Sequence, residues 1–145
     1  GRAVVNFKGP LVFVVVARYH GGAYVVFSKT LNPSLTAFAL EGSFASVLGG
    51  APAAAVVFPR QVTREAQQDP RYAEAVSRLE NDPSFTQREF DEVYRAIHAE
   101  KQTALAQRFD TIHNIERAKQ VNSIDEIIGV GELRPRIIAT IRDGL

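Results

Sequence analysis

The residue types best suited to chemistry lie at residues 18–24, Arg-Tyr-His-Gly-Gly-Ala-Tyr, where an apolar run ends in a glycine pair. The run 11–17 is predicted to be a buried strand, and residues 23–28 are predicted to be a short helix. The first amides of a helix have no acceptor within it, and glycine lets a ligand approach the backbone closely. The segment therefore indicates either a site that holds an oxyanion through backbone amides or a tight turn between strand and helix.

A second glycine pair lies 28 residues further along the chain, at Gly49-Gly50-Ala51. It also separates an apolar run from a stretch of small residues, 51–58, that is predicted to be a helix. Two similar copies suit a chain that winds repeated strand-and-helix turns of similar length. The same two interpretations, a ligand-binding loop and a tight turn, apply to this pair.

The sequence lacks the patterns of several other kinds of catalytic centre. It has no cysteine, which excludes a disulfide scaffold, a thiolate zinc site and a cysteine nucleophile. It has no Gly-x-Ser-x-Gly segment and no phosphate-binding glycine motif, and its three histidines do not have metal-binding spacing. We expect no metal. We expect His98 and His113 at the surface, whereas His20, beside the first glycine pair, either packs or contacts an anionic ligand.

The composition is that of an ordinary globular domain. Of the 145 residues, 46% are hydrophobic and 23% are charged, and 17 basic residues nearly balance 16 acidic ones. A nucleic-acid-binding protein usually has a basic excess, which this chain lacks. No apolar run approaches the roughly 20 residues that span a membrane, and the N-terminus lacks the blocks of a secretory signal. We therefore expect a cytoplasmic protein with no nucleic-acid or membrane partner, and, because Gly1 opens within an apolar pattern, a piece of a longer chain.

Three regions are predicted along the chain, and together they form an α/β fold. Residues 1–60 form a core of strands, glycine pairs and helices, residues 61–122 are mainly helical, and residues 123–145 form a final strand and helix. Further strands are expected over 35–40 and 124–128, and helices over 70–81, 86–108, 111–120 and 133–142. Two helix starts have recognisable caps, Asp69-Pro70 and the Thr86–Glu89 capping box.

Residues 14–29 resemble the strand, Gly-Gly-Ala-Tyr and helix segment of the biotin-dependent acyl-CoA carboxylases, in the C-terminal half of their carboxyltransferase (β) component. Residues 36–40 and the second glycine pair are similar to this family in order and spacing, and residues 123–134 are similar to its final strand and the start of its closing helix. The resemblance covers nearly the whole chain. It implies a crotonase-like (ββα-superhelix) half-domain with an additional C-terminal helical region, whose partner is the N-terminal half of the carboxyltransferase.

The resemblance also implies an activity. In this family a carboxyl group passes from carboxybiotin, held on a separate carrier domain, to a short acyl-CoA such as acetyl-CoA or propionyl-CoA. By position, Gly22 and Ala23 supply the amides of an oxyanion hole that faces the biotin ureido oxygen, and His20 is a further candidate for the active site. The residues implied in substrate binding are Gly21, Tyr24, Gly49, Gly50 and Ala51.

Three functions remain open at this point. The first is a carboxyltransferase that works with the N-terminal half, the biotin carboxyl carrier domain and further copies of itself, and of which the isolated piece is inactive. The second is another crotonase-superfamily enzyme that acts on CoA thioesters, a decarboxylase or a hydratase, and this one has no need to bind biotin. The third is a non-catalytic assembly domain of a multisubunit carboxylase, in which the amides of residues 21–24 are unavailable to a ligand.

Overall fold

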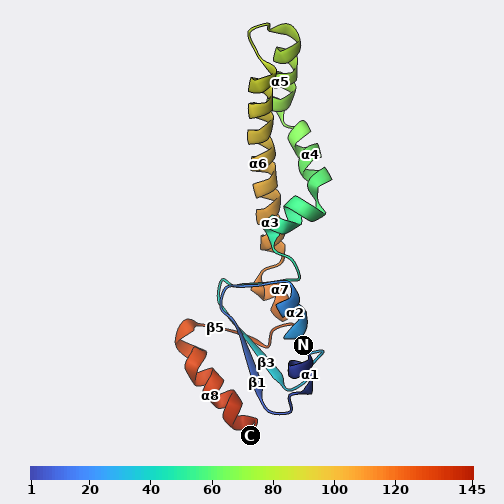
Figure 1. The fold of residues 1–145 in the computed structure, drawn as a ribbon. Helices are drawn as coiled ribbons and strands as arrows, with labels where there is room; N and C mark the ends of the chain where they lie inside the picture. Colours follow the sequence, from blue (N-terminus) through green and yellow to red (C-terminus); the bar gives the residue numbers. More distant parts are fainter. The chain divides into compact units, whose positions relative to one another are not determined.

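The computed structural model describes residues 1–145, and the chain divides into two compact units. The sheet unit comprises Gly1–Gly49 and Asp110–Leu145, and the helical unit comprises Gly50–Phe109 (Figure 1). The composition of the sequence places the boundaries between regions after residues 60 and 122, whereas the contacts in the structure place them after residues 49 and 109. The final strand and helix therefore pack within the same unit as the first 49 residues.

Two parallel sheets form the centre of the sheet unit. The larger has the order β1-β3-β5, and the smaller pairs β2 with β4. The strands are β1 (Leu11–Val15), β2 (Arg18–Tyr19), β3 (Leu35–Leu40), β4 (Phe44–Ala45) and β5 (Glu126–Ile128). The predicted bounds of β3 are confirmed. β1 ends earlier than predicted because the chain leaves the larger sheet to form β2, and β5 is shorter because it pairs only with Phe38–Leu40 of β3.

One face of the larger sheet carries the core of this unit. Inward-facing residues alternate along β1 and β3, as the pleat of a strand requires. Two helices, α2 (Gly22–Val26) and α7 (Ile115–Gln120), contribute side chains to this face. The buried cluster consists of Val15, Tyr19, Leu35, Ala37, Ala39, Ala45, Ile115, Ala118 and Ile124, with Leu11, Phe13, Tyr24, Phe27 and Ile127 packed against it.

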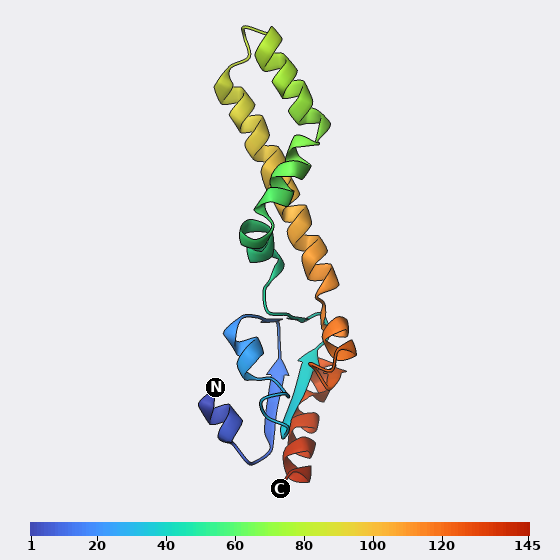
Figure 2. The ribbon, with the colours of Figure 1, turned by 90° about the vertical axis from the view of Figure 1, so that its right-hand side faces the viewer.

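The remaining helices of the sheet unit are α1 (Arg2–Asn6), a 3-10 turn η2 (Val130–Glu132) and α8 (Leu133–Asp143). Figures 1 and 2 show α8 and α2 on opposite sides of the larger sheet. The predicted closing helix is confirmed as α8, but Ile138 and Ile141 on it are 48% and 40% exposed. The apolar residues of α8 are therefore only partly covered within this chain.

The helical unit begins with α3 (Gly50–Pro52) and a π-helical turn η1 (Ala53–Val57), followed by α4 (Pro59–Gln67), α5 (Pro70–Asn81) and α6 (Gln87–Ile112). The end of α6, from residue 110 onward, is assigned to the sheet unit. Its small buried cluster joins Ala54, Val62 and Leu105. α6 continues one turn beyond its predicted end, so α7 starts at Ile115 rather than at residue 111. None of the helices combines the length and the apolar character needed to cross a membrane.

Both predicted helix caps of the helical unit are confirmed. A side-chain oxygen of Asp69 accepts a hydrogen bond from the backbone N–H of Arg71 at 3.1 Å, at the start of α5. The Thr86 amide donates to the Glu89 carboxylate at 2.7 Å, and the Glu89 amide donates to the Thr86 hydroxyl at 3.3 Å. These reciprocal bonds satisfy amides that the first turn of α6 leaves without helical acceptors.

Candidate functional site

The first glycine pair follows β2 and opens α2, with Gly21 as the N-cap and Gly22 as the first helical residue. The short helix expected over residues 23–28 is confirmed, but it begins at Gly22 and ends at Val26. Gly21 has a φ of 69° and a ψ of −142°, a conformation that side chains rarely permit. Its amide donates to the backbone oxygen of Val47 at 2.9 Å. The Gly21 N–H is therefore already used by the protein, and the donors left for a ligand begin at Gly22.

Gly22 and Ala23 form the start of α2, and both are exposed. A Cβ atom added at Gly21 or Gly22 would meet nothing within 4 Å beyond the adjoining backbone, so the space at both Cβ positions is open. Amides in the first turn have no acceptor within their own helix. Gly22 and Ala23 are therefore exposed residues at a position where backbone amides have no helical acceptor.

Tyr19 fixes α2 from the preceding strand. Its hydroxyl lies 2.9 Å from the backbone oxygen of Ala23 and 3.0 Å from that of Phe27, and donates its proton to these acceptors. The side chain is buried between Phe13 and Tyr24, whose ring centroids are 4.7 and 5.3 Å away. Burial raises the pKa of Tyr19 to about 12, with a smaller contribution from Tyr24. Tyr19 therefore remains a neutral donor that connects both ends of α2 to β2.

The His20 side chain contacts the segment after β4. Its Nδ1 lies 3.1 Å from the backbone oxygen of Ser46 and 3.2 Å from the Ser46 hydroxyl, which itself donates to the Leu48 carbonyl. The carbonyl acceptor assigns the ring proton to Nδ1. Nε2 is buried and has no hydrogen-bond partner. Of the two interpretations that the sequence left open for His20, its contacts in this chain are those of a packed residue.

The second glycine pair falls at the boundary between the two units. Gly49 is buried in the sheet unit, and a Cβ atom there would lie 3.1 Å from His20 Nε2. Gly50 and Ala51 belong to the helical unit, where they begin α3. Of the residues implied in substrate binding, Gly49 therefore contacts His20, the residue before Gly21.

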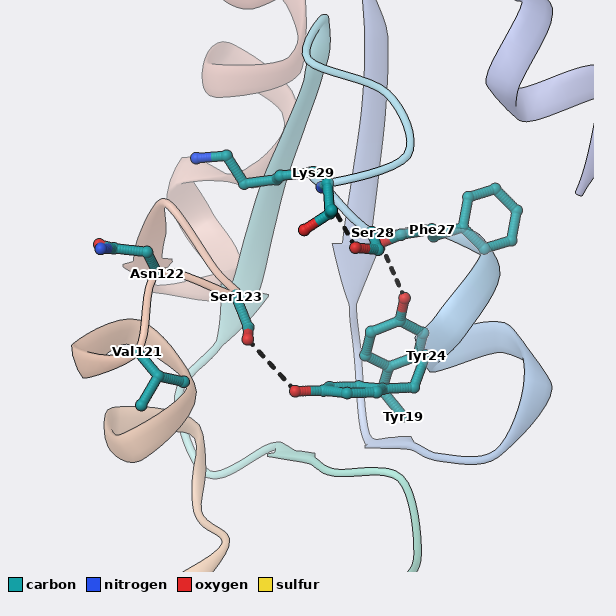
Figure 3. Close-up of a pocket in the computed structure, with 9 residues that line it drawn as sticks. Tyr19, Tyr24, Phe27, Ser28, Lys29, Val121, Asn122 and Ser123 are labelled. Carbon is teal, nitrogen blue, oxygen red and sulfur yellow. Dashed lines mark hydrogen bonds between the residues drawn. The ribbon is translucent and has the colours of Figure 1, made fainter.

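Tyr24, the remaining implied binding residue, lines a pocket of about 240 Å³ in the sheet unit (Figure 3). Its hydroxyl lies 3.2 Å from that of Ser123, which comes from the loop between α7 and β5. The other wall comes from the chain after α2, where Lys29 is ion-paired with Asp125. The full lining consists of Tyr19, Tyr24, Phe27, Ser28, Lys29, Thr30, Val121, Asn122 and Ser123.

Sequence reasoning identified Tyr24 but missed Ser123 and Lys29 as its neighbours. Ser123 is 99 residues from Tyr24, so no local pattern relates them. One signal was available: Lys29 lies in residues 14–29 and Ser123 in residues 123–134, two of the segments that carry the family resemblance. Asp125 has a structural part here, because its second carboxylate oxygen accepts the Ala37 amide of β3 at 2.8 Å.

The other two histidines take no part in this site. His98 is half-buried, with its ring centroid 5.9 Å from that of Tyr94, rather than fully solvated as expected. His113 is also half-buried, just before the Asn114 cap of α7. No group of three or more histidine and carboxylate side chains lies close enough to share a metal ion. The polar groups beside Tyr24 are thus the hydroxyl groups of Tyr19, Ser28, Thr30 and Ser123, the Asn122 amide and the Lys29 ammonium group.

Comparison with known families and proteins gives one family match. A family model described as the carboxyl transferase domain matches residues 2–142. No curated protein matches the chain. The family match spans both units, so the helical unit is part of the matched domain.

Two similar crystal structures are both of transcarboxylase 12S, described as a hexamer assembly. One contains hydrolysed methylmalonyl-coenzyme A, and the other contains methylmalonyl-coenzyme A and methylmalonic acid. They are 17% identical to this chain, with TM-scores of 0.59 and 0.56, and each match covers 98% of this chain. The chain spans only 21% of the transcarboxylase chain. At this identity the likeness shows the fold, and it confirms the fold class expected from the sequence.

Proposed function

The chain belongs to the carboxyl transferase domain family, and from this premise we propose that it is the C-terminal half of the carboxyltransferase of a biotin-dependent acyl-CoA carboxylase. Its α/β architecture is that of the crotonase-like carboxyltransferases. The proposed reaction transfers a carboxyl group to a short acyl-CoA, acetyl-CoA or propionyl-CoA. The observation that supports this proposal best is the pair of exposed residues Gly22 and Ala23 at the start of α2, with open space at the Cβ position of Gly22.

In the proposed mechanism this chain supplies an oxyanion hole. The amides of Gly22 and Ala23 donate to an oxygen on which negative charge develops, and their fixed positions mean that little reorganisation is needed as the charge appears. Gly21 sets the direction of these amides through its positive φ, and Tyr19 holds α2 in place. Carboxybiotin, delivered on a separate carrier domain, would supply the carboxyl group, and the biotin left after its release would accept the α-proton that the acyl-CoA loses. No side chain of this chain therefore has to act as a base in this scheme.

The proposal requires partners. The chain spans a fifth of the transcarboxylase chain, and we assign the second oxyanion hole, which stabilises the acyl-CoA enolate, to an N-terminal half. The other partners are the biotin carboxyl carrier domain and further copies of the protein. In this assignment Gly49 supports the first glycine pair, and Tyr24 supports the wall of the neighbouring pocket.

The test compares the intact protein that contains this chain with the 145-residue chain alone. Both are assayed with carboxybiotin and with acetyl-CoA or propionyl-CoA. We expect acyl-CoA-dependent carboxyl transfer by the intact protein and none by the isolated chain. Transfer by the isolated chain would contradict the assignment of the second hole to another part of the protein. An intact protein that decarboxylates or hydrates CoA thioesters without biotin would instead support a different CoA-thioester enzyme, and inactivity in all assays would support an assembly domain.

A further inference from the structure

The backbone on both sides of His20 is bonded to the segment that follows β4. The Ser46 amide donates to the Tyr19 carbonyl at 3.1 Å, and the Gly21 amide donates to the Val47 carbonyl at 2.9 Å. Between these two bonds, the His20 imidazole reaches the Ser46 carbonyl through Nδ1. Pairing between residues 19–21 and 46–47 thus continues past β2 and β4 up to the residue before Gly22.

Gly49 provides the space that the His20 ring occupies. A Cβ atom at this position would lie 3.1 Å from Nε2 and 3.2 Å from Cδ2, tighter than ordinary van der Waals contact. Gly49 has no positive φ, because the glycines with positive φ are Gly21 and Gly42. The requirement for glycine at residue 49 therefore comes from the neighbouring imidazole and not from the backbone conformation.

We propose that His20 is a positioning residue, which with Ser46 and Gly49 fixes the backbone that directs the Gly22 and Ala23 amides. Nε2 is buried against Gly49 and Nδ1 is bonded to Ser46, so both ring nitrogens contact the segment that follows β4. His20 then acts on a ligand only through the amides that follow it. Its part in carboxyl transfer rests on the proposed function, whereas its contact with Gly49 does not.

The first experiment is a double-mutant cycle in the intact protein. Gly49→Ala places a methyl group against the ring, and we expect it to lower the thermal midpoint by about 2–5 °C and carboxyl transfer by about 10- to 100-fold. In the double variant with His20→Ala the ring is gone, so the methyl group should add no further loss to that of His20→Ala alone. Gly131→Ala is the matched control, because its Cβ position is open, and it should change neither measurement.

If the two substitutions acted independently, their shifts of the thermal midpoint would add and their losses of transfer rate would multiply in the double variant. That result would overturn the contact between His20 and Gly49. The thermal cycle can be measured even in a protein without carboxyl transfer, so a failure of the proposed function is distinguishable from a failure of this inference. A protein that transfers carboxyl groups but shows no thermal coupling refutes the inference alone.

A second comparison separates positioning from direct contact with a ligand. The side-chain amide of His20→Asn reaches the place of Nδ1 and can still donate to the Ser46 carbonyl, whereas that of His20→Gln extends to the place of Nε2. We expect His20→Asn to keep more of kcat than His20→Gln, with the KM for acyl-CoA unchanged in both. A higher kcat for His20→Gln than for His20→Asn would show that the Nε2 position contacts a ligand, and would overturn the positioning role.

Discussion

Two Gly-Gly-Ala segments precede helices in this chain, and the same three residues meet different physical demands in each. At Gly21 the φ of 69° requires glycine, and the space around the Cβ position is open. At Gly49 the backbone makes no such demand, and the imidazole of His20 occupies the space that a side chain would need. The first pair opens an exposed helix start, whereas the second admits a neighbouring ring. The same three residue types are therefore required for different physical reasons in the two copies.

The two units that contain these segments also differ in how their polar groups are held. In the helical unit, hydrogen bonds from neighbouring residues lower the pKa of several carboxyl groups. These are Glu65, Asp69, Asp82, Glu89 and Glu100. In the sheet unit burial raises the pKa of Tyr19, whose hydroxyl is bonded to the backbone of α2. Ion pairs and hydrogen bonds between charged groups, close in sequence or on adjacent helices, thus stabilise the helical unit. The helix after the first glycine pair is held instead by the buried, neutral hydroxyl of Tyr19.

The largest effect is expected from a substitution that removes a backbone hydrogen-bond donor at the first glycine pair. Gly22→Pro removes one amide while keeping a residue that the first position of a helix tolerates. We expect carboxyl transfer by the intact protein to fall about 100-fold or more, the usual consequence of losing one oxyanion donor. Gly22→Ala is the matched control, because it keeps the amide and its methyl group meets open space.

The readouts are the rate of carboxyl transfer and the thermal midpoint of each Gly22 variant. Wild-type activity in a well-folded Gly22→Pro variant would show that this amide takes no part in the mechanism. Equal losses in Gly22→Pro and Gly22→Ala would mean that the side chain, and not the missing donor, causes the defect.

The next prediction separates the two reasons for glycine. Gly21→Ala forces a side chain into a φ of 69° with a ψ of −142°, at a cost of about 1–3 kcal/mol in the free energy of unfolding. Because the cost is conformational, His20→Ala should not reduce it, in contrast to the Gly49→Ala cost. Chemical denaturation of the single and double variants measures both. Relief of the Gly21→Ala cost by His20→Ala would show that the two glycines are constrained in the same way.

The contrast between the glycines explains which parts of the structure were predictable from sequence. The caps at Asp69 and Thr86 were correct because a capping bond joins residues two or three positions apart. The strand 35–40 was correct because its apolar run is bounded by turn residues. The bounds of β1 and β5 were wrong by two residues each, since they depend on pairing with distant strands.

The candidate site was predictable to a similar extent. The exposed helix start at Gly22 and Ala23 follows from a strand, a glycine pair and a helix that are adjacent in sequence. The orientation of His20 does not, because it is decided by Ser46 and Gly49, which are 26 and 29 residues away. The predicted start of α7 at residue 111 is too early, although the signal that sets it is local. The Asn114 side chain caps the helix by accepting a hydrogen bond from the Arg117 amide at 2.9 Å.

A smaller effect is expected from the group that holds α2 after the first glycine pair. Tyr19→Phe removes the hydroxyl that is bonded to the Ala23 and Phe27 carbonyls, and should lower the free energy of unfolding by about 1 kcal/mol. Tyr24→Phe is the matched control, since it removes a hydroxyl that is bonded only to the Ser123 side chain. Thermal and chemical unfolding of both variants compare them. A greater loss for Tyr24→Phe would contradict the assignment of Tyr19 as the residue that fixes α2.

The last prediction concerns pH and distinguishes the two units. The pKa of Tyr19 is raised from 10.0 to about 12 in the folded chain, so its contribution to stability is complete below pH 10 and is lost as the pH rises toward 12. Hydrogen bonds from Arg71 and Lys101 hold the pKa of Asp69 well below its ordinary 3.8, so its contribution is present above that value and is lost as the pH falls. Tyr19→Phe should therefore weaken the alkaline dependence of the unfolding midpoint and leave the acid limb unchanged, and Asp69→Asn should weaken the acid dependence. Unfolding midpoints measured from acid to alkaline pH for the wild type and both variants test this, and a change of the acid limb in Tyr19→Phe would show that the two units do not titrate independently.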